Sequence, residues 1–329
     1  MPVRDITTVK SSSYRAFSPL ISATRHRLSS IPLRRPNLPG NPTHQAIMST
    51  EWDPTQFFCD SSQPIAPFAL LVLNQPINER AFAVLKKHAC FTICADGGAN
   101  RFYDMMHKQG RESQELPNLI IGDLDSIRPS VRSHYEGLGV SVIKDPDQYS
   151  TDFTKCLKYL RAHAAEIITK RVISTQSRSA RLEILIMGGL GGRVDQALSQ
   201  IHHLYMMTRE VAGESAAGDL YLISEESITF LLQSGRHTIR TPRTNRPGVC
   251  PEQGEDEYYL LEENVGIIPL SGPARITTRG FQWDVEDWLT EIGGQLSTSN
   301  HIRADEVMVE TGVPVLFTLE LAERFKRMR

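Results

Sequence analysis

The chain has 329 residues, of which 40% are hydrophobic, and its formal net charge at pH 7 is -2. A composition of this kind supports a sizeable core and, at this length, about two domains. The small net charge argues against general nucleic-acid binding, and the longest apolar run, residues 68–73, is much too short to span a bilayer. We therefore expect a globular protein with neither nucleic-acid nor membrane partners.

Residues 1–47 differ in composition from the rest of the chain. They contain seven lysine and arginine residues against one acid, Asp5, and they are rich in serine and proline. Three interpretations are open: a mitochondrial transit peptide, a disordered tail, and an upstream start that is seldom used, since Met48 opens a more ordinary sequence. We favour a disordered, dispensable extension on a cytoplasmic protein and leave it out of the fold prediction.

Between residues 68 and 207, short apolar runs alternate with stretches in which apolar residues have helical spacing. We predict strands at 68–73, 91–95, 119–121, 140–143 and 182–187. We predict helices at 81–88, from Gly98 to about 106, at 151–165 and at 194–207, the third with Ser150 or Thr151 as its N-cap. Strands that alternate with helices indicate a parallel sheet with helices on both faces. The predicted fold of residues 65–215 is therefore an α/β domain with a doubly wound parallel sheet.

After about residue 220 the pattern changes to short strands separated by turn residues. We predict these strands at 221–223, 228–232, 237–239, 265–270, 274–278, 306–309 and 315–319. Such a series is typical of a sandwich or a barrel, so residues 220–329 are predicted to form an all-β domain. Residues 240–264 contain proline, glycine and many acids, and we expect a long exposed loop there.

Six aspartates gather at the ends of the predicted α/β elements. They are Asp96, Asp123, Asp125, Asp147, Asp152 and Asp195. Asp96 in Asp-Gly-Gly, taken alone, is more simply explained as a turn or helix-cap residue, whereas for the pair Asp123 and Asp125 alone the two explanations are about equal. Because ligands bind beyond the carboxyl ends of parallel strands, we expect the six to converge on one edge, where their repulsion calls for a cation. Carboxylate oxygens suit Mg²⁺, so the sequence predicts a magnesium site.

A glycine-rich loop, residues 188–192, lies between a predicted strand and a predicted helix. Its backbone amides and the helix N-terminus suit a phosphate, although a tight structural turn explains the loop equally well, and the chain contains no GxxxxGK[ST] motif. Arg193 can bind phosphate with both arms of its guanidinium, and Lys155 either reaches phosphate or lies on a solvated helix face. His202 and His203 are expected to be packing or surface residues. These parts suit phosphoryl transfer, which depends on positioning and charge neutralisation.

The segments that carry this chemistry resemble those of the thiamine pyrophosphokinase family in order and spacing. They are Ala-Asp-Gly-Gly-Ala-Asn at 95–100, Ile-Gly-Asp-Leu-Asp-Ser at 121–126, Asp-Gln at 147–148 with Thr-Asp-Phe-Thr-Lys at 151–155, and Gly-Gly-Leu-Gly-Gly-Arg-Val-Asp-Gln at 188–196. Three later segments extend the resemblance: Gly-Ile-Ile-Pro-Leu at 266–270, Thr-Thr-Arg-Gly-Phe-Gln-Trp at 277–283 and Leu-Ser-Thr-Ser-Asn at 296–300. The resemblance covers residues 65–322.

The resemblance implies transfer of the β,γ-diphosphate of ATP to the hydroxyl of thiamine, which gives thiamine diphosphate and AMP. It implies a homodimer in which the α/β domain holds ATP and Mg²⁺. The β-rich domain contributes the thiamine pocket across the subunit interface. Two other functions stay open: a magnesium-dependent nucleotide phosphohydrolase or transferase, and a non-catalytic nucleotide- or thiamine-binding module.

The resemblance also implies roles for individual residues. The metal ligands are Asp123, Asp125 and Asp152, and the catalytic set adds Asp96 and Asp195, either of which orients or deprotonates the hydroxyl. The residues that contact ATP are Asp147, Gln148, Lys155, Gly189 and Arg193. Those that contact thiamine are Gln196, Trp283, Ser297, Thr298, Ser299 and Asn300. Stacking of Trp283 on thiamine suits an indole and a cationic ring, whereas the residue pattern alone favours core packing for Trp283 and an ordinary polar turn for Ser299 and Asn300.

Three features depart from the family pattern. The stretch 240–264 is long, Phe317 stands where tryptophan is frequent, and Arg279 and Phe281 stand where smaller or aliphatic residues are common. These departures leave the predicted fold intact and bear on the pocket and on regulation.

Overall fold

A computed structural model describes residues 49–59, 66–171, 181–210, 216–249 and 259–327. Residues 46–329 form one compact unit. The extension predicted to be disordered, residues 1–47, lies outside the described residues. Within the described ranges, no helix combines the length and the apolar character needed to cross a bilayer.

The first half of the unit is built on six parallel strands. In chain order they are β2 (Phe68–Val72), β3 (Phe91–Ala95), β4 (Leu119–Gly122), β5 (Ser141–Lys144), β6 (Leu182–Met187) and β7 (Ala217–Ile223). They lie in the spatial order β5-β4-β3-β2-β6-β7. The order reverses between β2 and β6, so the carboxyl ends of these two strands form the topological switch point, where ligands bind in such sheets.

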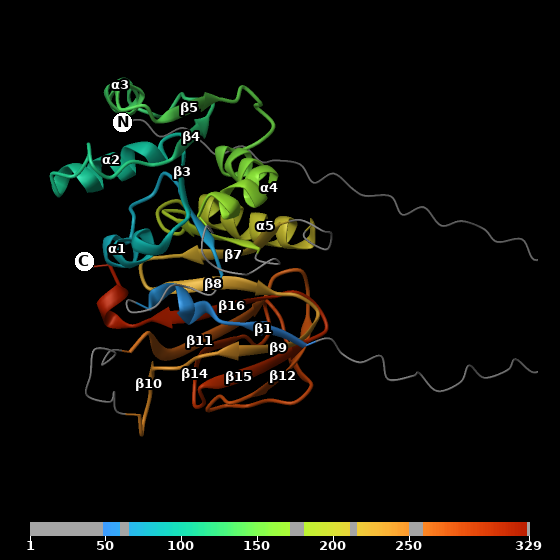
Figure 1. Ribbon diagram of the computed structural model, residues 1–329. Helices are drawn as coiled ribbons and strands as arrows, with labels where there is room; N and C mark the ends of the chain where they lie inside the picture. The colour runs from blue at the N-terminus through green and yellow to red at the C-terminus, as the bar shows by residue number, and fades with distance from the viewer. Residues whose placement is uncertain (1–48, 60–65, 172–180, 211–215, 250–258, 328–329) are drawn as a thin grey trace, which may run out of the picture. The chain divides into compact units, whose positions relative to one another are not determined.

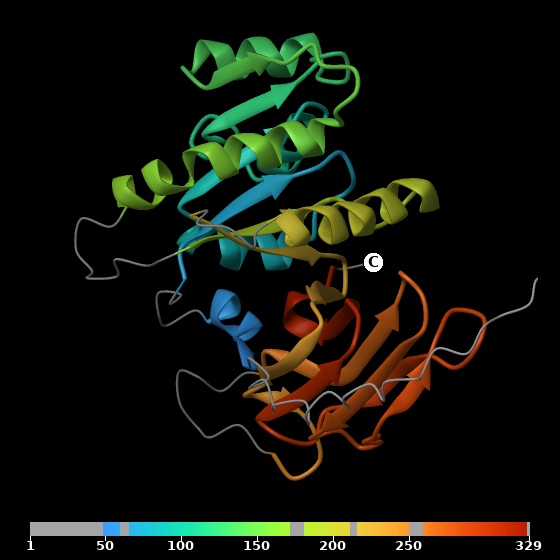
Figure 2. The same ribbon diagram turned by 90° about the vertical axis from the view of Figure 1, so that its right-hand side faces the viewer.

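Among the described residues, five α-helices pack on this sheet, and they cover both of its faces (Figure 1). They are α1 (Glu79–His88), α2 (Gly98–Lys108), α3 (Pro129–Gly137), α4 (Asp152–Arg171) and α5 (Val194–Glu210). Leu70 and Val72 of β2 belong to the core cluster that contains Phe82 of α1 and Phe102 of α2. Leu71 belongs to the cluster that contains the apolar face of α4, and Figure 2 looks onto the side that carries α4 and α5. Burial of both faces explains why the strands are continuous apolar runs, and it confirms the predicted helix-flanked parallel sheet.

The second half is a sandwich of β-sheets. The strands β8 (Ser227–Leu232), β16 (Val315–Leu321), β11 (Leu261–Pro269) and β10 (Thr244–Asn245) continue the sheet beyond β7. Strand β14 (Ser297–His301) pairs with the same edge of β11 as β10 does. A second sheet has the order β1 (Ser49–Trp52), β9 (Gly235–Arg240), β15 (Glu306–Thr311), β12 (Ala274–Arg279) and β13 (Trp288–Thr290). Phe230 and Phe317 share one apolar core with Ile239 and Val309 of the second sheet. The predicted β-rich second half is therefore confirmed, and one sheet runs through both halves.

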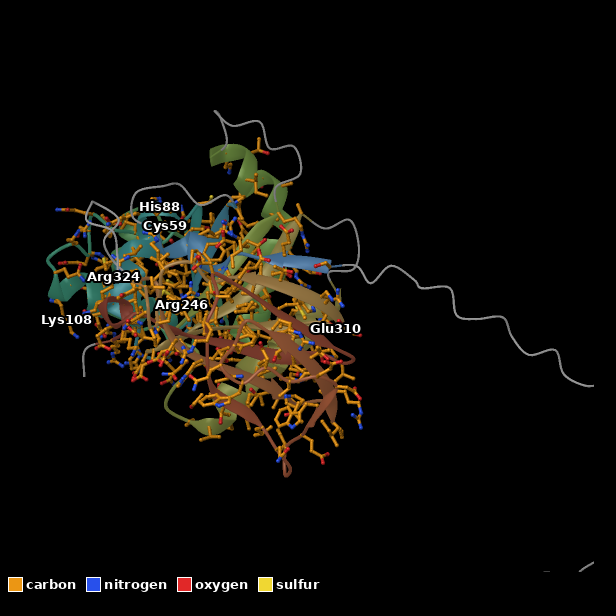
Figure 3. The ribbon with its side chains drawn as sticks, turned by 90° about the horizontal axis from the view of Figure 1, so that it is seen from below. Cys59, His88, Lys108, Arg246, Glu310 and Arg324 are labelled. Carbon is orange, nitrogen blue, oxygen red and sulfur yellow. The ribbon has the colours of Figure 1, made fainter. Side chains whose placement is uncertain are left out.

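Two pairs of side chains join neighbouring strands of the second sheet. Arg236 on β9 and Glu310 on β15 form an ion pair with 2.8 Å between Nη2 and Oε2, and Glu310 is labelled in Figure 3. The indole N–H of Trp52 on β1 donates to Nδ1 of His237 on β9 at 3.0 Å. Nε2 of His237 then carries the proton and donates to the carbonyl of Gln233 at 2.7 Å. Burial lowers the pKa of His237, so this ring stays neutral.

Several elements differ from the sequence prediction. Helix α3 and strands β1, β13 and β14 were not predicted, and the strand predicted at 221–223 pairs in parallel with β6. The predicted exposed loop at 240–264 is wrong for its described parts, since Thr241 and Thr244 are fully buried and β11 begins at Leu261. The Thr241 hydroxyl donates to the carbonyl of Ala304, which draws the segment into the fold. Residues 250–258 of the predicted loop lie outside the described residues.

Candidate active site at the switch point

Three of the six aspartates come together at the carboxyl edge of the parallel sheet. Asp96 follows β3, Asp123 follows β4, and Asp152 is the first residue of α4. Each offers a carboxylate oxygen, and these oxygens lie within 4.8 Å of one another. An octahedral Mg²⁺ with ligands at about 2.0–2.1 Å places its oxygens about 3–4 Å apart. The three carboxylates therefore fit one divalent ion after small side-chain adjustments.

Asp96 is buried and also braces the loop that follows β4. Its Oδ2 accepts the amide of Ser126 at 3.0 Å, and its Oδ1 accepts the amide of Ile127 at 2.9 Å. Burial raises the pKa of Asp96, the two amide donors lower it, and the charges of Asp152 and Asp123 raise it again. A side chain at Gly122 would place its Cβ 2.5 Å from the Cβ of Asp96, so this close packing requires glycine. Asp96 is thus both a residue that stabilises a turn and a member of the group of three carboxylates.

Lys155 faces this cluster from the first turn of α4. Its side chain is 2% exposed, and its Nζ lies 3.0 Å from Oδ1 of Asp152, which also accepts the amide of Asp123 at 3.3 Å. Desolvation lowers the pKa of Lys155, but the hydrogen bond and charge of Asp152 and the charge of Asp123 raise it further, so the net shift is upward. The ammonium group therefore offsets part of the negative charge of the cluster, and the solvated-face interpretation does not hold.

Asp125 lies outside the group of three among the described residues. Leu124 has a φ of 66°, so the backbone between Asp123 and Asp125 is not the extended strand that would put both side chains on one face. Asp125 is exposed and accepts the hydroxyl of Ser126 at 2.7 Å. The separation of Asp125 from the cluster is thus a local backbone effect.

Asp147 and Gln148 lie on the segment between β5 and α4. Asp147 is half-buried and accepts the amide of Tyr149 at 2.9 Å, while Gln148 is exposed. A hydrogen bond from Ser150 lowers the pKa of Asp147, followed by the bond from Tyr149. Thr151 caps α4, since its hydroxyl accepts the amide of Thr154 at 3.2 Å, as the sequence predicts.

A small cavity of about 180 Å³ lies at the switch point itself. Its lining includes Asn74 and Gln75 after β2, Gly188 and Gly189 after β6, and Gln196 and Gln200 on α5. Gly188 has a φ of 69°, and a Cβ there would lie 2.7 Å from two carbonyl oxygens, so only glycine fits. Asn74 and Gln75 were missed from the sequence, although two amides directly after a buried strand were a usable signal.

Arg193 and Asp195 form a two-pronged ion pair where α5 begins. The two contacts are 3.1 Å from Nε to Oδ1 and 2.7 Å from Nη2 to Oδ2, and both side chains are exposed. The hydrogen bond from Arg193 lowers the pKa of Asp195. The guanidinium is therefore accessible to an incoming phosphate, which would compete with Asp195 for it.

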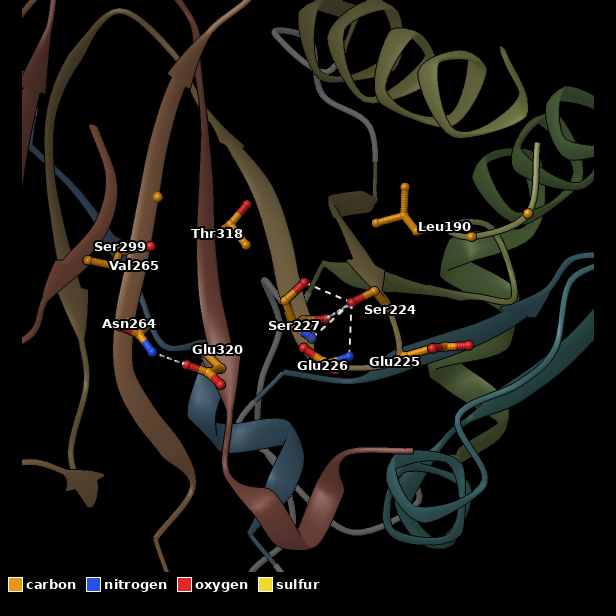
Figure 4. A pocket seen from close by; sticks show the side chains of 13 residues that line it. Leu190, Ser224, Glu225, Glu226, Ser227, Asn264, Val265, Ser299, Thr318 and Glu320 are labelled. Atoms are coloured by element: carbon orange, nitrogen blue, oxygen red, sulfur yellow. Dashed lines mark hydrogen bonds between the residues drawn. The ribbon is translucent and has the colours of Figure 1, made fainter. Parts of the chain in front are cut away.

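A larger cavity of about 710 Å³ joins the glycine loop to the β-rich half (Figure 4). Leu190, Gly191 and Gly192 line one side, and Val265, Ser299 and Thr318 line another. Ser299 has a φ of 54°, an uncommon conformation for serine. The structure thus places Ser299 and the glycine loop on one cavity within a single chain.

The other residues predicted to contact thiamine have different surroundings. Trp283 is 53% exposed, and its ring centroid lies 5.0 Å from that of His301. Asn300 is buried, whereas Thr298 is exposed and Ser297 is half-buried on β14. The motif is thus a strand that pairs with β11, not a turn.

The residues that depart from the family pattern have structural roles. Phe317 is fully buried in the core, with its ring 5.5 Å from Phe230 and 6.5 Å from Phe281. Arg279 pairs with Glu286 at 3.1 Å on the surface. Phe317 and Phe281 therefore both belong to the core of the β-rich half.

His203 links α5 to the first turn of α4. Its Nδ1 donates to the carbonyl of Ser199 at 2.6 Å, so its Nε2 accepts the hydroxyl of Thr154 at 2.8 Å. Its ring also lies 4.9 Å from that of Phe153. This agrees with the expected packing role. His203 thereby joins α4, which begins at Asp152, to α5, which follows Arg193.

Known proteins that resemble this chain match it in both halves. The family model described as thiamin pyrophosphokinase, catalytic domain, matches residues 82–213, and the one described as thiamin pyrophosphokinase, vitamin B1 binding domain, matches residues 236–316. Thiamine pyrophosphokinase 1 of Arabidopsis thaliana is 32% identical over 274 residues, which cover 80% of this chain and 90% of that protein.

Solved structures of thiamin pyrophosphokinases also match this chain. Thiamin pyrophosphokinase from Candida albicans matches with a TM-score of 0.66 and 26% identity, over 83% of this chain and 93% of that one. Yeast thiamin pyrophosphokinase matches with a TM-score of 0.67 and 25% identity, over 84% of this chain and 93% of that one.

Proposed function

We propose that this chain, which belongs to the thiamin pyrophosphokinase family, transfers the terminal diphosphate of ATP to the hydroxyl of thiamine. The products are thiamine diphosphate and AMP. The observation that carries the proposal is the group of three carboxylates within 4.8 Å, at the edge of the sheet that also holds the glycine loop. Such a site supplies charge neutralisation and phosphate positioning, which are the main needs of phosphoryl transfer.

The carboxylates Asp96, Asp123 and Asp152 hold Mg²⁺ in this proposal. The ion, when bound, offsets negative charge on the phosphate oxygens. Lys155 keeps Asp152 in place. Its positive charge offsets part of the combined negative charge of the carboxylates and of the phosphates. Asp125 is exposed and follows Leu124. It reaches the same ion only if the loop rearranges, so we assign it a secondary role.

Arg193, Gly189 and the neighbouring amides position the phosphates of ATP, with Asp147 and Gln148 at the approach to the site. When phosphate takes the guanidinium, Asp195 is released from its ion pair and its pKa returns towards the usual value. We therefore propose that Asp195 accepts the proton of the thiamine hydroxyl. Asp96 accepts backbone amides at both of its oxygens and holds the ion in this proposal, which leaves Asp195 for the proton.

The bond changes follow from these positions. The hydroxyl oxygen of thiamine forms a bond to the β-phosphorus of ATP, and its proton passes to Asp195. The bond from the β-phosphorus to the oxygen shared with the α-phosphate breaks, and AMP leaves with that oxygen. No covalent enzyme intermediate is needed, because the chain only has to align the two substrates.

We further propose a homodimer in which Trp283 and Ser299 serve the thiamine site, with Gln196 on the facing α/β half. Val194 and Leu198, one helical turn apart on α5, are both exposed, and Leu289, Ile292 and Leu296 are exposed in the segment that follows Trp283 along the chain. Exposed apolar side chains on two segments that carry candidate site residues suit contact with a second copy of the chain.

The test is an assay of the purified protein with ATP, Mg²⁺ and thiamine, in which AMP and thiamine diphosphate are measured together. We expect the two products in equal amounts, and none without thiamine. Nucleotide breakdown without thiamine would indicate a phosphohydrolase instead. Thiamine binding with no AMP formed would indicate a non-catalytic binding module.

A further inference from the structure

Trp283 lies on a connection, between β12 and β13, that is fixed by hydrogen bonds. The carboxylate of Asp284 accepts the amide of Gly280 at 3.0 Å and the hydroxyl of Thr278 at 3.2 Å. The amide of Thr278 donates to the carbonyl of Val285 at 2.9 Å, which closes the connection. Trp283 is therefore presented by an ordered turn rather than by a loosely held loop.

Asn300 on β14 holds the backbone of Trp283 from the other side. Its Oδ1 accepts the amide of Trp283 at 3.2 Å, and its Nδ2 donates to the carbonyl of the same residue at 3.0 Å. The Oδ1 also accepts the amide of His301 at 2.8 Å. A carboxamide has capacity for about four hydrogen bonds, so three of them are already used inside the protein.

The side chains of Asn300 and Trp283 differ in their exposure to solvent. Asn300 is 6% exposed, whereas Trp283 is 53% exposed although its backbone is held. On one side of the indole lies the ring of His301, whose Nδ1 bonds to Oε1 of Gln282 at 2.9 Å. The ring therefore has a fixed support and an accessible surface, which suits a platform for a flat cationic ligand.

We propose that Asn300 is a positioning residue that fixes Trp283 as a preformed platform for the aromatic rings of thiamine and does not itself contact the ligand. This rests on the proposed function, in which Trp283 meets thiamine. Preorganisation of this kind raises affinity because the ordering of the aromatic side chain is complete before the ligand arrives. The role differs from the direct contact that the family resemblance implies for Asn300.

The experiment is a double-mutant cycle with Asn300→Asp and Trp283→Ala. Asn300→Asp keeps both acceptor bonds but replaces the donor that faces the Trp283 carbonyl with an oxygen. We expect the KM for thiamine to rise about tenfold in Asn300→Asp, the factor that corresponds to 1.4 kcal/mol, while the KM for ATP stays unchanged. Starting from Trp283→Ala, the same change at Asn300 has no further effect on KM, because the platform is already gone.

A matched control is Asn245→Asp on β10, where an exposed asparagine donates to Glu262 at 2.7 Å. We expect wild-type KM values there. An equal rise in KM for Asn300→Asp with and without Trp283 would overturn the proposal, because it would mean that Asn300 contacts thiamine directly. Unchanged KM in Trp283→Ala alone would instead remove the thiamine contact of Trp283 from the proposed function.

Hydrogen exchange of the Trp283 amide separates these cases without relying on activity. We expect slow exchange in the wild type and fast exchange in Asn300→Ala, because alanine removes the acceptor of this amide. If Asn300→Asp does not fold, Asn300→Ser gives the KM comparison without a buried charge. Slow exchange in folded Asn300→Ala would show that the turn is held without Asn300.

Discussion

Asp123 and Asp152 are the residues at which the proposed chemistry is most directly open to test. We expect Asp123→Asn to lower turnover at least about 100-fold, since loss of one group that organises charge at a reacting phosphate typically costs that much. The folded state should tolerate the change, because Asp123 is half-buried and its carboxylate receives a long bond, 3.2 Å, from the Asp125 amide. Steady-state kinetics and the melting temperature with and without Mg²⁺ provide the measurements.

The matched control is Asp104→Asn, which breaks a surface ion pair between Asp104 on α2 and Arg128 before α3. Surface pairs contribute little to stability, so this variant should keep wild-type turnover and the wild-type rise in melting temperature with Mg²⁺. A rise in melting temperature that persists in Asp123→Asn would argue against a metal ligand at that position.

Glu183 on β6 gives the protein a predictable response to rising pH. Burial raises its pKa from 4.5 to about 8, and the charge of Asp219 adds to the rise. A raised pKa stabilises the folded state below the unfolded value, and this stability is lost as the pH rises through about 8. We therefore expect the wild-type melting temperature to fall between about pH 4.5 and about pH 8 by more than that of Glu183→Gln.

Glutamine at position 183 can still accept the amide of Asp219, which now bonds to Oε2 at 2.6 Å. Glu136→Gln, at an exposed pair with Arg132, serves as the comparison and should follow the wild-type curve. Parallel melting curves for wild type and Glu183→Gln across this range would contradict the expected titration.

At the scale of elements, the contact of α5 with α4 depends on His203. Burial lowers its pKa, so its contribution to stability is present above the unfolded value of 6.5 and is lost as the pH falls through the lower folded value. We expect His203→Leu to destabilise the protein by about 1–2 kcal/mol at neutral pH, since it leaves the Thr154 hydroxyl without its acceptor. Denaturant unfolding at neutral and mildly acidic pH measures this loss and its disappearance in acid.

His202→Leu is the adjacent control, because His202 is exposed on the same helix. It should unfold like the wild type. Equal destabilisation by the two substitutions would mean that general helix packing, and not the bond to α4, explains the effect.

The sequence was sufficient for elements with strong apolar periodicity. Strands β3 and β6 match their predicted bounds, because fully buried parallel strands are continuous apolar runs that end at glycine or aspartate. Helix α3 was missed because only Val131 and Tyr135 of its nine residues are buried. Strand β14, Ser-Thr-Ser-Asn-His, has no apolar residue at all, and only its pairing with β11 makes it a strand.

The candidate site was predictable in part for the same reason. The sequence places six aspartates near one sheet edge, but the side-chain directions depend on single backbone angles. The φ of 66° at Leu124 separates Asp125 from Asp123. Asp96, whose carboxylate belongs to the cluster, has a φ of 38°. The switch point between β2 and β6, which adds Asn74 and Gln75, follows from strand order, and strand order is a tertiary property that local pattern does not contain.

At the scale of the whole molecule, the exposed apolar side chains on α5 set the expected oligomeric state. Leu198 is 56% exposed beside the glycine loop. We expect the wild type to sediment as a dimer and Leu198→Glu to sediment as a monomer with little activity, because a charge at a buried interface is costly. Sedimentation velocity and the product assay, run on the same samples, test both parts.

The comparison variant is Leu138→Glu, which changes an exposed leucine after α3, far along the chain from the candidate interface. It should remain dimeric and active. A wild-type protein that turns over at full rate as a monomer would exclude a site shared between subunits.

The first strand of the fold also protects the protein from aggregation. Strand β1 covers the outer edge of β9, and its Trp52 supplies the donor that keeps the His237 ring neutral and in place. A chain trimmed to begin at Met48 keeps this cover. A chain that begins at Pro54 exposes the backbone of β9, and uncovered strand edges pair readily with other molecules. The four residues of β1 thus decide whether a shortened protein stays dispersed or self-associates.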